Sequence, residues 1–149
     1  MTFEELKDRD GQYVIQTYGR NPIALDHGRG ATLYGVDGKE YIDFAAGIGV
    51  LSVGTAHPKW VAAVTEQAGR LAHVSNLYYT QPYIDLAEKL CTRSGMAAAF
   101  FGNSGAEGNE GILKVARKYS FDKYGEGRGT VLTLNHSFHG RTMATLAAT

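Results

Sequence analysis

The residues best suited to chemistry form a short stretch, 102–107 (Gly-Asn-Ser-Gly-Ala-Glu), between an apolar run and a helical pattern. Backbone N–H groups at a helix N-terminus lack partners within the helix, and the helix dipole favours anions there. Gly105 and Ala106 have no bulk that would keep a phosphate away, and Ser104 can add a hydroxyl donor. The stretch therefore predicts an anion site. The alternative is that Ser104 only caps the helix, with Glu107 completing a capping box.

A second stretch, 137–142 (Ser-Phe-His-Gly-Arg-Thr), follows the next apolar run. Phe138 can stack on a flat ligand, and the Arg141 guanidinium can bind a carboxylate or phosphate by two parallel hydrogen bonds. The alternative is that Phe138 belongs to the core and Arg141 pairs with a surface acid. We expect both stretches to meet at one edge of a sheet, where ligands of open α/β sheets bind.

The elements that must position these stretches form one strand–helix–strand unit. The uninterrupted apolar runs at 96–101 and 130–134 predict strands buried on both faces, and the periodicity between them predicts a helix over 106–124. Such a unit implies an α/β fold with a parallel sheet and a right-handed crossover. Gly108 and Gly111 weaken that helix by up to about 1 kcal/mol each, without an evident reason.

The first part of the chain predicts helices and a small β-meander. Asp37-Gly38 is a tight-turn signal within a meander over residues 23–44. The other expected elements are a helix that begins near Phe3 and ends or is interrupted at Gly11, and helices over 59–71 and 82–91.

Composition excludes several classes of protein. The chain has 149 residues, 15 basic and 15 acidic side chains and one cysteine. The balanced charge argues against nucleic acid or an anionic membrane as partner, and one cysteine excludes a disulfide framework. We also expect no membrane span and no metal site, because no apolar run is long enough and His136 and His139 lack a third ligand. Cytoplasmic localisation and a buried core are the resulting expectations.

The last residues, 143–149, are apolar and carry no stop signal. Natural termini are usually polar and end an element. We therefore expect an incomplete part of a longer α/β protein.

Several motifs together resemble the class III aminotransferases. They are residues 100–107, Asn109-Glu110, residues 114–117, residues 137–142, Thr17-Tyr18-Gly19-Arg20, residues 37–44 with Gly47-Ile48, His57-Pro58 and residues 75–78. The resemblance implies fold type I, pyridoxal 5'-phosphate and a homodimer of the full-length protein. It also implies that residues 1–53 are an N-terminal segment of the small domain and that 54–149 begin the cofactor-binding large domain, with the first strands of its mainly parallel sheet.

Carried over to this sequence, the resemblance gives four residues a role. Gly105 and Ala106 would bind the cofactor phosphate through their backbone N–H groups. Phe138 would stack on the pyridine ring, and Arg141 would hold the α-carboxylate of an amino acid or 2-oxo acid substrate.

Within the family, the resemblance is strongest to members that transfer an amino group between N-acetylornithine and 2-oxoglutarate in arginine biosynthesis. Ornithine, succinylornithine and 4-aminobutyrate remain alternative substrates. A non-catalytic phosphate-binding or interaction module is the alternative from another class.

The lysine that forms the Schiff base in this family has no counterpart among residues 1–149, so the chain holds no expected catalytic residue. Pyridoxal chemistry needs such an amine to hold the cofactor and move the α-proton. We therefore predict that the purified 149-residue chain, supplied with pyridoxal phosphate, does not transfer amino groups. Measurable aminotransferase turnover by this chain would contradict the prediction.

Overall fold

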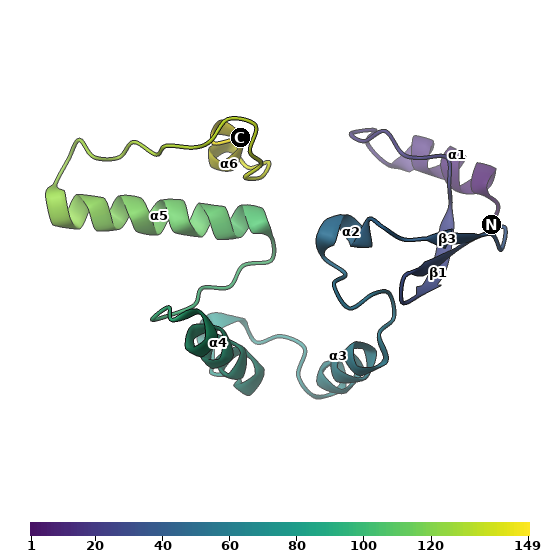
Figure 1. Cartoon of the computed structure of the whole chain (residues 1–149), viewed down its shortest axis with the longest axis horizontal. Coiled ribbons are helices and arrows are strands. Elements are labelled where there is room, and N and C mark those ends of the chain that lie inside the picture. The colour runs from purple at the N-terminus through teal and green to yellow at the C-terminus, as the bar shows by residue number, and fades with distance from the viewer. The chain divides into compact units, whose positions relative to one another are not determined.

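The computed structural model describes residues 1–149, which fall into two compact units, Met1–Ser75 and Asn76–Thr149 (Figure 1). The division between a small and a large domain after residue 53 remains a prediction.

The first unit opens with helix α1, Phe3–Tyr13, which begins at a complete capping box. The backbone N–H of Glu5 donates to Thr2 Oγ1 at 3.3 Å, and the Thr2 N–H donates to Glu5 Oε2 at 2.8 Å. The expectation that the helix ends or is interrupted at Gly11 is wrong. A single glycine costs about 1 kcal/mol in a helix, which these capping bonds can offset.

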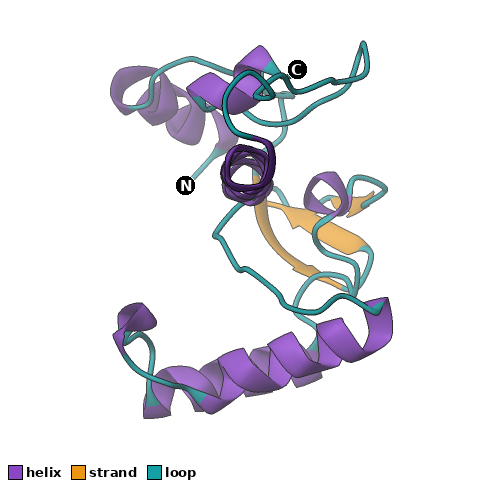
Figure 2. Ribbon diagram, turned by 90° about the vertical axis from the view of Figure 1, so that its left-hand side faces the viewer, coloured by secondary structure: helices purple, strands orange, loops and turns teal.

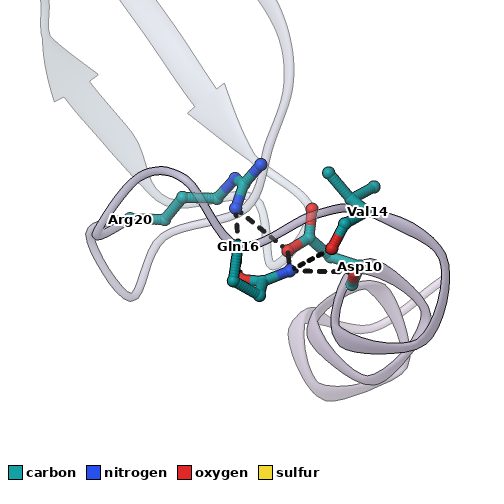
Figure 3. A network of polar contacts seen from close by, with 4 residues as sticks. All are labelled: Asp10, Val14, Gln16 and Arg20. Carbon is teal, nitrogen blue, oxygen red and sulfur yellow. Dashed lines mark hydrogen bonds and ion pairs between the residues drawn. The ribbon is translucent and has the colours of Figure 1, made fainter.

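A polar network then ties the following loop to the end of α1 (Figure 3). Gln16 Nε2 donates to the carbonyl oxygens of Asp10 and Val14 at 3.0 and 2.8 Å. Asp10 Oδ2 also accepts from Gln16 Nε2 at 2.9 Å and lies 3.0 Å from Nη1 of Arg20. The loop therefore leaves α1 in a defined direction toward the first strand.

The expected meander is confirmed as an antiparallel sheet in the order β1-β2-β3 (orange in Figure 2). Its strands are β1 (Leu25–Arg29), β2 (Thr32–Gly35) and β3 (Glu40–Ile42). The expected turn contains Gly38 with a φ of 79°, a conformation that glycine adopts without strain.

Between the sheet and the next long helix, the chain makes a short turn, α2 (Ala46–Gly49). All four of its residues have positive φ angles, which include 64° at Ile48. Asp43 Oδ1 supports the turn by accepting from the N–H groups of Ala45 and Ala46, both at 2.9 Å. Helix α3 (Pro58–Arg70) follows and has proline in its first turn, as expected.

The second unit is built mainly from helices. The short 3₁₀ turn η1 (Ser75–Leu77) spans the division between the units and precedes α4 (Gln81–Ser94). Helix α4 ends at Gly95, whose φ of 73° suits a glycine C-cap. Helix α5 (Gly105–Tyr124) runs for 20 residues, and α6 (Met143–Ala147) is one short turn (Figure 1).

The expected strands at 96–101 and 130–134 are not present, and neither is the expected parallel pairing. Apolar runs of this kind form strands only where a neighbouring segment completes the backbone hydrogen-bond ladder. No backbone–backbone hydrogen bond joins either run to another segment of residues 1–149.

The expected hydrophobic core is also absent, since no hydrophobic side chain is buried. Phe44, Ile48 and Tyr79 are 94%, 95% and 97% exposed, whereas the one fully buried side chain is that of Thr145. The apolar faces of the helices therefore have no cover within these residues. None of the helices combines the length and hydropathy that crossing a bilayer requires.

Gly54 provides a test of the first unit. Its φ is 80°, and a Cβ there would lie 2.9 Å from the carbonyl oxygen of Gly30, within the bridge that joins Gly30 to Thr55. We expect Gly54→Ala to destabilise the full-length protein by about 1–3 kcal/mol, because the left-handed backbone and a rigid backbone clash act together.

The measurement is the urea midpoint, with Gly11→Ala as the matched control. A Cβ at Gly11 meets nothing within 4 Å, so this variant should keep or raise the midpoint. Equal midpoints for the two variants would contradict the interpretation of Gly54.

Candidate functional site

The first predicted stretch forms the N-terminus of α5. Ser104 is the N-cap, and its Oγ accepts from the backbone N–H of Glu107 at 3.2 Å. The return bond of a capping box is missing, because the Glu107 carboxylate instead accepts from the backbone N–H and the Nδ2 of Asn103. Gly102 leaves room for this arrangement, since a Cβ there would lie 2.9 Å from Glu107 Cβ.

Capping leaves two backbone donors free at this helix end. The N–H groups of Glu107 and Gly108 are bound to the side chain and the carbonyl of Ser104. Those of Gly105 and Ala106 have no partner, and no atom lies within 4 Å of the Cβ position of Gly105. The cap and the predicted anion site therefore coexist, because Ser104 can cap the helix through its oxygen and still donate its own proton.

The second predicted stretch is the loop before α6. Phe138 is 69% exposed, and the Arg141 guanidinium carbon lies 5.3 Å from the centre of its ring. Phe138 is therefore not buried in a core formed by residues 1–149, and an aromatic ring and a cation lie together on one loop.

The structure brings the two stretches into contact through the backbone. Gly140 is buried, with a φ of 136°, and a Cβ there would lie 2.7 Å from both Ala106 Cβ and Thr145 Oγ1. Asn109 Nδ2 also donates to the carbonyl oxygen of His139 at 2.6 Å. The loop that carries Phe138 and Arg141 is therefore held directly against the first turns of α5.

Several residues of this contact were not assigned a role from the sequence. Asn109, Glu110 and Thr142 lie within the recognised motifs, but their spacing gives no sign that they form hydrogen bonds between positions about 30 residues apart.

The structure explains why α5 has a glycine at position 111. A Cβ at Gly111 would lie 2.8 Å from the Phe100 ring, so this position lets the ring pack on the helix.

Two histidines, His136 and His139, lie in the stretch before α6. His136 lies in the loop with a φ of 59°, and His139 Nδ1 is 3.4 Å from Ser137 Oγ. No three His, Cys, Asp or Glu side chains gather where they could hold a metal ion.

Comparison with known proteins agrees with these motifs. The family model for class III aminotransferases matches residues 13–149. The chain is 52% identical over 149 residues to acetylornithine aminotransferase from Haemophilus ducreyi and 51% identical to that from Methanocaldococcus jannaschii. It spans 38% and 37% of the length of these two relatives.

Solved structures have the same fold. Ornithine aminotransferase from Toxoplasma gondii matches with a TM-score of 0.90 at 31% identity, over 97% of this chain and 35% of that one. N-acetylornithine aminotransferase from Stenotrophomonas maltophilia matches with a TM-score of 0.76 at 39% identity, over 89% of this chain and 35% of that one. The fold is thus that of the corresponding part of the pyridoxal-phosphate-dependent aminotransferases, and the chain belongs to the class III aminotransferase family.

Proposed function

We propose that the protein carrying this chain transfers an amino group between N-acetylornithine and 2-oxoglutarate, with pyridoxal 5'-phosphate as cofactor. The observation that carries the proposal is the contact between the free amides of α5 and the loop that holds Phe138 and Arg141. It supports the proposal because two free backbone donors, an aromatic ring and a cation lie on adjoining segments, where they would serve the phosphate, the pyridine ring and the substrate carboxylate.

The residues present fit this cofactor. The N–H groups of Gly105 and Ala106 would donate to the phosphate, and the Ser104 hydroxyl has a proton left for the same group. Space at the Cβ position of Gly105 lets the phosphate come close to the backbone. When bound, pyridoxal phosphate supplies an electron sink for the negative charge that develops at the substrate α-carbon.

The loop residues would orient the ring and the substrate. Phe138 presents an exposed aromatic surface on which a pyridine ring can stack. The Arg141 guanidinium lies over the Phe138 ring and would hold the α-carboxylate of either substrate by two parallel hydrogen bonds. Holding the carboxylate there would fix the α-carbon relative to the ring, which is the orientation that transamination needs.

The choice of N-acetylornithine rests on sequence similarity. The relatives named acetylornithine aminotransferase from Haemophilus ducreyi and Methanocaldococcus jannaschii are 52% and 51% identical to this chain. A role in arginine biosynthesis follows from this substrate. Ornithine and other amino donors of related enzymes are the alternatives.

We further propose that the full-length protein is a homodimer in the cytoplasm. The homodimer is what the resemblance to class III aminotransferases implies, and the chain belongs to that family. A single cysteine suits a reducing compartment.

Replacement of Arg141 by alanine in the full-length enzyme tests the site. We expect the KM values for N-acetylornithine and for 2-oxoglutarate to rise together by about 10–100-fold, because each carboxylate loses its bidentate partner. Steady-state kinetics measure both values, and the cofactor absorption band shows whether pyridoxal phosphate is retained.

The matched control is Arg128→Ala. Arg128 also lies over an aromatic ring, 4.6 Å from the centre of Tyr124, but on the turn after α5. It should leave both KM values unchanged. Unchanged KM values for Arg141→Ala would reject the proposed role of Arg141. Turnover with ornithine but not with N-acetylornithine would show that ornithine is the amino donor. A wild-type protein that binds no pyridoxal phosphate would favour a non-catalytic module.

A further inference from the structure

A cluster of three hydroxyl and carboxyl side chains joins α5 to the N-terminus of α6. Thr142, the N-cap of α6, donates from Oγ1 to Glu110 Oε1 at 2.5 Å. Thr142 Oγ1 also lies 2.8 Å from the hydroxyl of Thr145, which is fully buried. Glu110 and Thr142 are half-buried. The cluster therefore lies partly out of water, where a lost hydrogen bond is costly.

The Glu110 carboxylate determines which hydroxyl donates in each hydrogen bond of the cluster. A carboxylate only accepts, so the single hydroxyl proton of Thr142 must point to Glu110. In the bond between the two hydroxyls the Thr145 hydroxyl must then be the donor. Thr145 Oγ1 in turn accepts from the backbone N–H of Thr142 at 3.0 Å, which completes the chain. Removal of the carboxylate would leave the bonds between Thr142 and Thr145 in place but would take away the bond that ties the Thr142 hydroxyl to α5.

The cluster lies next to Arg141 in the sequence and beside the anion site in space. On one side of Arg141, Gly140 packs on Ala106. On the other side, Thr142 is bound to Glu110. Both contacts lead to the first two turns of α5, the rigid helix whose N-terminus carries the free amides. The backbone of Arg141 is therefore held between two attachments to the same helix.

We propose that Glu110 is a positioning residue, which acts through the Thr142 hydroxyl to hold the Arg141 backbone at a fixed place relative to the N-terminus of α5. This inference rests on the proposed function. Glu110 touches neither substrate nor cofactor in it. Its task is to keep the carboxylate-binding guanidinium and the phosphate-binding amides at the spacing that one bound substrate and cofactor require.

The test uses the full-length holoenzyme and a double-mutant cycle. Glu110→Ala and Thr142→Val should each raise the KM for N-acetylornithine and for 2-oxoglutarate by about 10-fold, with kcat within about 3-fold of wild type. The double variant should be no worse than the poorer single variant, because both remove the same bond. A Kd for glutarate, an unreactive dicarboxylate, should rise by the same factor in calorimetry.

Conservative variants distinguish the loss of this one hydrogen bond from a general destabilisation of the protein. Glu110→Gln keeps an oxygen acceptor and Thr142→Ser keeps the hydroxyl, so both should bring KM back to within about 3-fold of wild type. The matched control Glu88→Ala removes an exposed carboxylate of α4 and should change neither KM nor the glutarate Kd.

Each outcome decides the proposal. It is overturned if Glu110→Ala leaves both KM values and the glutarate Kd unchanged, if the effects of the two single variants add, or if Gln and Ser fail to rescue. If Glu110→Ala does not fold, the comparison of Thr142→Val with Thr142→Ser decides in its place. Failure of the proposed function is distinct, because the wild-type protein would then show no turnover with these substrates.

Discussion

The close contact of Gly140 with Ala106 is the constraint on which the candidate site depends. A Cβ at position 140 would lie 2.7 Å from that of Ala106, so only glycine lets the loop backbone approach the helix this closely. The approach brings the carbonyl of His139 within reach of Asn109 and the hydroxyl of Thr142 within reach of Glu110. A larger residue would separate the loop from the free amides of α5.

Polar contacts, rather than a hydrophobic core, fix this arrangement within the described residues. The apolar faces are uncovered, yet the one fully buried side chain, Thr145, belongs to a hydrogen-bonded cluster. Hydrogen bonds are directional, so they fix the position of a loop more narrowly than apolar contact does. The contact requires a positive φ at position 140, and glycine adopts this φ without steric strain.

Much of the local structure could be predicted from the sequence. Hydrophobic periodicity and capping residues predicted α3, α4 and α5 with ends close to those observed. The turn signal Asp37-Gly38 predicted the meander. Ser104 was recognised as a possible cap and as part of an anion site, and the structure allows both. The strands at 96–101 and 130–134 could not be predicted correctly, since a strand depends on a partner that its own residues do not specify.

The sequence by itself determined the family, the long helices α3, α4 and α5, and the residues for which we propose a chemical role, namely Gly105, Ala106, Phe138 and Arg141. These follow from local patterns, because caps, turns and motifs depend on residues a few positions apart. Only the tertiary structure decided how the Arg141 loop is attached to α5 through Glu110 and Thr142. That attachment joins positions 32 residues apart, and such contacts depend on how the chain folds back on itself, which no local pattern specifies.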